Sequence, residues 1–184
     1  MKFYMSSNPP VNLSKFLNTD QSKREDFQEI SWGEKFVTIF AYCFMPNHFH
    51  LLLRQETENG ISRYLSQLLN SYTRYFNIKH TRVGQLFLDQ FKNVLVENEE
   101  QLLHLSRYIH LNPYSSNIVN NFTDLEKYEW SSLGEYIGSG EESVCDKDMV
   151  MVSFKNKASY KKFVFDRADY QKELKQIEHL LTEE

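Results

Sequence analysis

Two short apolar segments stand out in the first third of the chain. Residues 36–44 (FVTIFAYCF) are rich in β-branched and aromatic side chains, and residues 48–54 (HFHLLLR) resume the apolar run. The intervening Met45-Pro46-Asn47 is typical of a turn. We therefore predict two adjacent antiparallel strands.

Helical periodicity follows these strands. Across residues 61–78, apolar and aromatic side chains recur at the spacing of one helical face. A second helix is expected after Asn98, which suits an N-cap, and should end before Pro113. Between the helices, residues 86–96 are expected to be extended and to contain at least one strand. The predicted element order is β-β-α-β-α.

The C-terminal part has weaker patterns. It contains an aromatic stretch, YEWSS at 128–132, and then two expected short helices, the last at 166–181. Because no internal repeat or clean linker is visible, we predict one main domain at 1–133 and a helical appendage at 134–184. The fold class is α+β.

The composition indicates the cellular compartment in which the protein is expected. The two cysteines lack partners at metal-ligand spacing, which disfavours a disulfide framework or a zinc cluster. No apolar run approaches the roughly 18 residues of a membrane span, and the N-terminus has no apolar signal region. We expect a cytoplasmic protein that does not associate with a membrane.

The formal net charge of −4 weighs against a nucleic-acid partner, but the average hides a basic middle. Five cations gather there: Arg63, Arg74, Lys79, Arg82 and Lys92. They suit contacts with phosphates. The alternative is an ordinary solvated helix face.

The second apolar segment carries two histidines at alternate positions. Side chains alternate along a strand, so His48 and His50 share one face. Neutral imidazoles bind divalent ions, and a strand fixes their separation. The alternative for a lone His-x-His pattern is packing.

The second predicted helix supplies complementary chemistry. Tyr108 and Asn112 are four residues apart and lie on one face. Asn112 offers a neutral oxygen ligand for Mg²⁺ or Mn²⁺, and Tyr108 offers a hydroxyl nucleophile that needs activation. Taken alone, a tyrosine in this position is far more often an ordinary core or surface aromatic than a nucleophile.

Five strings occur together in a diagnostic order: AYCFMPNHFHLLL (41–53), YLSQLLNSYTRYFN (64–77), GQLFLDQFKNVLVE (84–97), SRYIHLNP (106–113) and YEWSS (128–132). In this order and spacing they resemble the REP-associated tyrosine transposases, which belong with the single-tyrosine insertion-sequence transposases of the HUH superfamily. The combination of His-hydrophobe-His with a later Tyr-x-x-x-Asn makes the resemblance specific.

The resemblance implies a role for each matching residue. It makes His48, His50 and Asn112 ligands of Mg²⁺ or Mn²⁺, and Tyr108 the nucleophile. It implies a ferredoxin-like, RRM-like antiparallel sheet with helices packed on one face. The implied reaction cleaves and rejoins single-stranded DNA near a hairpin through a 5′-phosphotyrosine. Arg107, beside the nucleophile, joins the expected DNA contacts, and the protein acts as a homodimer or a monomer.

The N-terminal region departs from the family pattern. Members usually begin with a further strand and helix before the strand at Phe36, whereas MKFYMSSNPP does not resemble that opening. We therefore expect the first sheet strand to be missing, which exposes an edge beside the site. The alternative function is a catalytically inert, truncated relic that still binds DNA hairpins.

Overall fold

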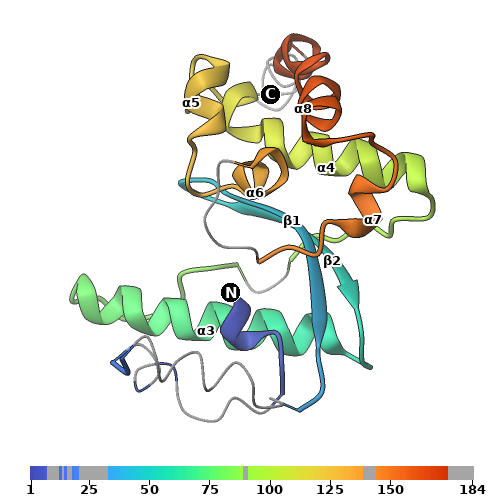
Figure 1. Cartoon of the computed structure of the whole chain (residues 1–184). Coiled ribbons are helices and arrows are strands. Elements are labelled where there is room, and N and C mark those ends of the chain that lie inside the picture. Colours follow the sequence, from blue (N-terminus) through green and yellow to red (C-terminus); the bar gives the residue numbers. More distant parts are fainter. Residues whose placement is uncertain are drawn as a thin grey trace. The chain divides into compact units, whose positions relative to one another are not determined.

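A computed structural model of the chain describes residues 1–7, 13, 15, 18–20, 33–88, 91–138 and 144–173. Within them the protein is α+β, with several helices and one two-stranded antiparallel sheet (Figure 1). The chain forms two compact units, one from Met1–Thr38 and Arg54–Val94, the other from Ile39–Leu53 and Leu95–Glu184. Within the described part of the chain, no helix combines the length and apolarity that crossing a membrane requires.

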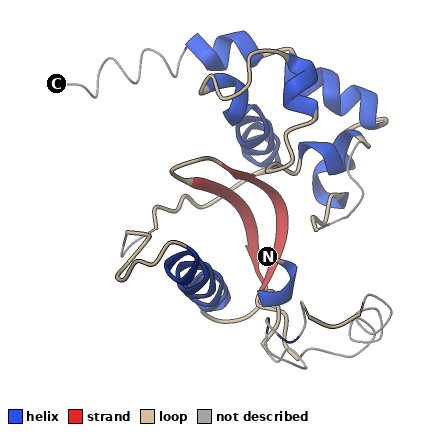
Figure 2. Ribbon diagram, turned by 90° about the vertical axis from the view of Figure 1, so that its left-hand side faces the viewer, coloured by secondary structure: helices blue, strands red, loops and turns tan. Residues whose placement is uncertain are grey.

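The sheet is a hairpin of β1 (Val37–Phe44) and β2 (Phe49–Gln55), drawn in red in Figure 2. The backbone N–H of Met45 donates to the carbonyl of His48 at 2.8 Å and closes the turn. Most of β1 is buried, as its β-branched and aromatic composition indicates. Both strands and their antiparallel pairing are confirmed.

The first unit is built around α3 (Gly60–Lys79), which confirms the helix predicted at 61–78. The short 3-10 helix η1 (Lys2–Tyr4) contacts it, and the Tyr4 hydroxyl donates to Ser71 Oγ at 2.6 Å. A Cβ at Gly60 would collide with the carbonyl oxygen of Phe36, so only glycine permits this close approach.

The strand predicted within residues 86–96 is wrong for the residues that the structure describes there, 86–88 and 91–96. A strand needs a neighbouring edge for its backbone hydrogen bonds. Leu88 is 91% exposed, Val94 and Leu95 are also largely exposed, and none of the described residues of this segment is fully buried. Residues 89–90 lie outside the described part.

The second unit centres on α4 (Glu99–Ser115), shown in yellow-green in Figure 1. Around it lie α5 (Phe122–Glu126), α6 (Leu133–Ile137), α7 (Asp148–Met151) and α8 (Lys157–Phe165). The helix α8 packs on both α4 and α6. The predicted appendage begins at α6, and its boundary at 133 stays a prediction. The helix predicted at 166–181 lies partly outside the described residues.

Both ends of α4 follow from local chemistry. Asn98 is the predicted N-cap, and its Oδ1 accepts a hydrogen bond from the backbone N–H of Gln101 at 2.9 Å. The predicted end before Pro113 is wrong, because the helix runs on to Ser115. Proline removes only one backbone donor, and here the loss falls in the last turn. The Pro113 carbonyl in turn accepts from the N–H of Ile118 at 2.9 Å.

Candidate active site

The turn and first residues of β2 bring two imidazoles together. His48 directly precedes β2 and is exposed, whereas His50 lies in the strand and is half-buried. Their ring centroids are 5.0 Å apart and their planes nearly perpendicular. The two rings are therefore neighbours on the hairpin, as the predicted pairing of His48 with His50 requires.

The orientation of His48 is set by its neighbour in the turn. Its Nδ1 lies 2.6 Å from Asn47 Oδ1. An amide oxygen only accepts, so the Nδ1–H of a neutral imidazole donates and the lone pair resides on Nε2. Asn47 thus acts as the kind of partner that orients metal-binding histidines.

The helix α4 carries the predicted nucleophile to this pair. The Tyr108 ring lies edge-on to the His50 ring, with centroids 5.6 Å apart, and its side chain is 37% exposed. One turn later, Asn112 is fully buried and its Nδ2 donates to the Tyr108 carbonyl at 3.1 Å. The structure therefore brings Tyr108 to His50 and leaves part of the tyrosine exposed to solvent.

The chemistry of the donor set allows a divalent cation. The described residues contain no group of three His, Cys, Asp or Glu suited to a metal, whereas the predicted set combines two imidazoles with an amide. Neutral imidazoles bind divalent cations, and the His48 and His50 rings lie 5.0 Å apart between centroids. Because the set contains no carboxylate, its ligands would not neutralise the cation, and both positive charges would remain to attract a phosphate.

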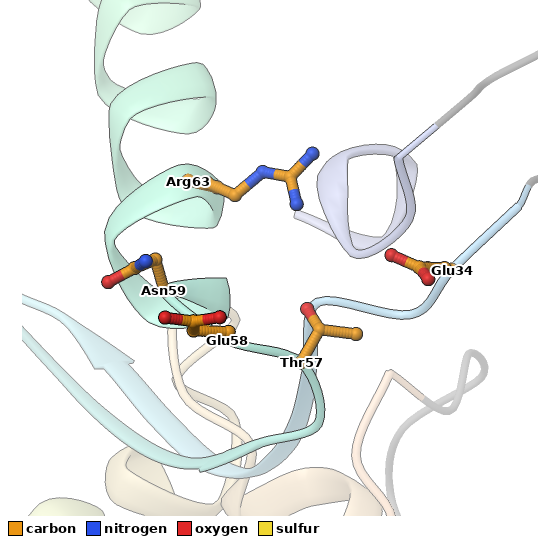
Figure 3. A pocket seen from close by; sticks show the side chains of 5 residues that line it. All are labelled: Glu34, Thr57, Glu58, Asn59 and Arg63. Carbon is orange, nitrogen blue, oxygen red and sulfur yellow. The ribbon is translucent and has the colours of Figure 1, made fainter.

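Arg63, a predicted DNA contact, lies in a depression of the first unit of about 520 Å³ (Figure 3). Its guanidinium stacks over the Phe36 ring at 4.3 Å. Glu34 and Glu58 line the same depression with Thr57 and Asn59. Two carboxylates beside one guanidinium weaken its attraction for phosphate, so this depression is a poor anion site.

Arg74 and Arg82 share a second depression in the first unit, of about 490 Å³, with Asn70, Thr73 and Asn77. Its lining contains no carboxylate. Arg82 donates to Asn77 Oδ1 at 3.1 Å and to the Gln85 carbonyl at 3.0 Å, which fixes its guanidinium. The depression that Arg74 and Arg82 share therefore suits the phosphates of a DNA backbone better than the depression at Arg63 does.

The remaining predicted DNA contacts have different surroundings. The Lys79 ammonium lies 5.6 Å from the Tyr75 ring centroid, and Lys92 is exposed. Arg107 stacks over the Phe163 ring of α8 at 4.4 Å and lies 2.7 Å from His104 Nδ1. Burial lowers the pKa of Arg107. The structure thus turns Arg107 toward α8.

Sequence patterns alone missed a buried histidine in α4. His110 is fully buried, with Nδ1 2.8 Å from Tyr160 Oη and Nε2 2.8 Å from Ser132 Oγ. Burial lowers the pKa of His110 to about 3. The available signal was its four-residue spacing from Ser106, which puts both on one helical face.

Comparison with known protein families finds a match over more than half of the chain. The sequence profile of a family described as "Transposase IS200 like" matches residues 6–112, which is more than half of the 184 residues. The matched range includes His48, His50, Tyr108 and Asn112 and begins upstream of Phe36. No curated protein and no solved structure matches the chain.

Proposed function

Because the chain belongs to the family of IS200-like transposases, we propose that it cleaves and rejoins single-stranded DNA through a covalent bond between Tyr108 and a 5′-phosphate. Membership implies a DNA transposase or endonuclease. The observation that carries the finer proposal is the contact between the half-exposed Tyr108 ring and the ring of His50.

The proposed step conserves the number of phosphoester bonds. Tyr108 Oη forms a bond to phosphorus as the bond from phosphorus to the 3′-oxygen breaks. The phenol loses its proton to the medium, and the departing 3′-oxygen gains one. The 5′-phosphotyrosine keeps the bond energy, so attack by another 3′-hydroxyl rejoins DNA without a nucleotide cofactor.

We infer that His48, His50 and Asn112 hold Mg²⁺ or Mn²⁺. Such a cation, when bound, polarises a non-bridging phosphate oxygen and orients the scissile bond. Asn47 orients the His48 imidazole, and the hydrogen bond from Asn112 to the Tyr108 carbonyl ties this ligand to the turn that bears the nucleophile. The paired imidazoles support the assignment.

Binding of the DNA strand is assigned to the basic middle of the chain. Arg74 and Arg82 contact phosphates in the depression they share, and Lys79 and Lys92 are further cations of the same basic middle. Arg63 is the weaker contact, because it shares its own depression with Glu34 and Glu58. Tyr72 and Tyr75 are about half exposed and offer rings on which unpaired bases stack. Arg107 contributes least, because its guanidinium packs on Phe163.

The wider arrangement is proposed to be ferredoxin-like. The hairpin and α4 supply two of its parts, and an antiparallel bridge between Cys43 and Ser131 lets β1 pair on a second edge. Since Tyr108 contacts His50 of the same chain, a monomer is the arrangement that we favour. A dimer that exchanges the tyrosine helix is the alternative.

A second candidate function is an inert relic that binds DNA hairpins without cleaving them. The described residues form a sheet of two strands, fewer than a ferredoxin-like sheet has, and this favours the relic. The two candidates share the DNA-binding surface and differ in whether Tyr108 forms a covalent bond to DNA.

The test is a denaturing gel. Purified protein is incubated with labelled single-stranded DNA from the sequence flanking its gene, with and without Mn²⁺. We expect a manganese-dependent covalent product that Tyr108→Phe abolishes while hairpin affinity stays within about twofold. Tyr114→Phe is the matched control on α4, because the Tyr114 hydroxyl bonds Asp169.

An adduct that survives in Tyr108→Phe would falsify the assignment of the nucleophile. DNA binding by the wild type without any adduct would select the relic.

A further inference from the structure

A chain of hydrogen bonds crosses the core of the second unit from β1 to α8 and passes through α4. Ser132 Oγ accepts from the backbone N–H of Tyr42 at 2.9 Å and lies 2.8 Å from His110 Nε2. On the other side of the ring, His110 Nδ1 lies 2.8 Å from Tyr160 Oη, which donates to Ser106 Oγ at 3.2 Å. Two of these five residues, His110 and Ser106, belong to α4.

All four side chains of this buried chain, Ser106, His110, Ser132 and Tyr160, have no solvent exposure. Buried polar groups are costly when their hydrogen bonds break, since water cannot replace the lost partner. A fully connected network therefore favours one relative placement of its elements over nearby alternatives.

Counting donors gives the network a single direction. Ser106 Oγ–H donates to the Leu103 carbonyl at 2.8 Å, so Ser106 must accept from Tyr160. The Tyr160 oxygen then accepts from Nδ1–H of His110. A neutral imidazole has one N–H, so Nε2 accepts from Ser132, whose Oγ is nearer to it than to the Tyr42 carbonyl at 3.2 Å.

The network bonds to one face of α4, and Tyr108 lies on the opposite face. Ser106 and His110 are four residues apart and share a face. At about 100° per residue, Tyr108 lies about 160–200° around the axis from both. One side of α4 is thus bonded to Tyr160 and Ser132, while the other presents Tyr108 to His50.

We propose that His110 and Tyr160 are positioning residues that set the rotation of α4 about its axis and thereby hold Tyr108 against His50. At a side-chain radius of about 5–6 Å, a rotation of about 10° displaces the tip of a side chain by about 1 Å. A misplacement of that size lowers a reaction rate by as much as about a hundredfold. The effect on rate rests on the proposed function; the effect on geometry does not.

The chain offers a matched control in Tyr136. This tyrosine is also buried, and its ring lies 5.0 Å from the His110 ring. Its hydroxyl, however, donates to the Phe40 carbonyl of β1 at 2.6 Å. Tyr136→Phe and Tyr160→Phe therefore remove the same atom from one aromatic cluster, and only the second breaks a bond to α4.

The geometry is tested by nuclear Overhauser effects between the ring protons of His50 and Tyr108 in the full chain. We expect the wild type and Tyr136→Phe to give equal intensities, and Tyr160→Phe to lose at least half. Ser106→Ala removes the acceptor on α4 itself and should cause the same loss of intensity. It replaces Tyr160→Phe in the test if that variant folds poorly. Equal intensities in all variants, or equal losses in both tyrosine variants, would overturn the proposal.

The catalytic consequence is tested by the single-turnover rate of adduct formation at saturating DNA with Mn²⁺. Tyr160→Phe should slow this rate at least tenfold with hairpin affinity within twofold of the wild type, and Tyr136→Phe should stay within twofold in rate. Equal rates in the two variants would overturn the proposal. A wild type that forms no adduct would refute the proposed function alone, because the ring contacts still decide the positioning role.

Discussion

At the residue scale, the buried imidazole of His110 links stability to pH. Its pKa in the folded protein is about 3, well below the 6.5 of a free histidine. Between these values the unfolded chain binds a proton that the folded protein does not, so the stability present above pH 6.5 is lost as the pH falls. The limiting slope is about 1.4 kcal/mol per pH unit.

We therefore predict that the free energy of unfolding of the wild type falls more steeply between pH 6.5 and 5 than that of His110→Asn. The difference in slope should approach about 1.4 kcal/mol per pH unit near pH 5. Urea denaturation at several pH values measures it. Parallel pH profiles would show that His110 takes up a proton in the folded state.

Residues of the site were predictable where local periodicity places them. Alternation along a strand put His48 beside His50, and the helical repeat put Tyr108 beside Asn112. The partners of His110 were not predictable in this way, because Ser132 and Tyr160 reach it from distant elements and only the tertiary fold joins them. Arg107 was predicted to contact DNA, but its guanidinium stacks on Phe163, which is distant in the sequence, so this packing was not predictable from local patterns either.

At the element scale, the start of α4 depends on Asn98. Its side chain satisfies the otherwise unpaired N–H of Gln101. Asn98→Ala should lower the free energy of unfolding by about 1 kcal/mol, whereas Asn98→Ser keeps an acceptor and should cost less. Chemical denaturation distinguishes the two. If both variants unfold like the wild type, the cap contributes nothing to stability.

Whole elements were predictable when their own sequence carried a strong repeat, as for the hairpin and for α3. The extended segment 86–96 failed because strand formation depends on a partner edge as much as on composition. The prediction for the end of α4 failed because a proline in the last turn removes only one backbone hydrogen bond. The loop that follows supplies another, from the N–H of Ile118 to the Pro113 carbonyl.

At the scale of the whole molecule, a net charge of −4 coexists with a local basic surface. Phosphate neutralisation releases counterions, so each lost contact lowers the salt dependence of binding. Arg74→Gln should reduce the slope of log affinity against log salt by about 0.7 for single-stranded DNA. Arg54→Gln is the control, because Arg54 already pairs with Glu56 at 2.9 Å. Fluorescence anisotropy measures both, and equal slopes would remove Arg74 from the interface.

The central claim is that Tyr108 is the nucleophile among the eleven tyrosines of the chain. The most direct measurement digests the protein after reaction with DNA and locates the attached nucleotide by mass spectrometry. We predict a phosphodiester on the peptide that contains Tyr108, formed only with the divalent cation present. A nucleotide on another tyrosine, such as Tyr114 of the same helix, would contradict that claim.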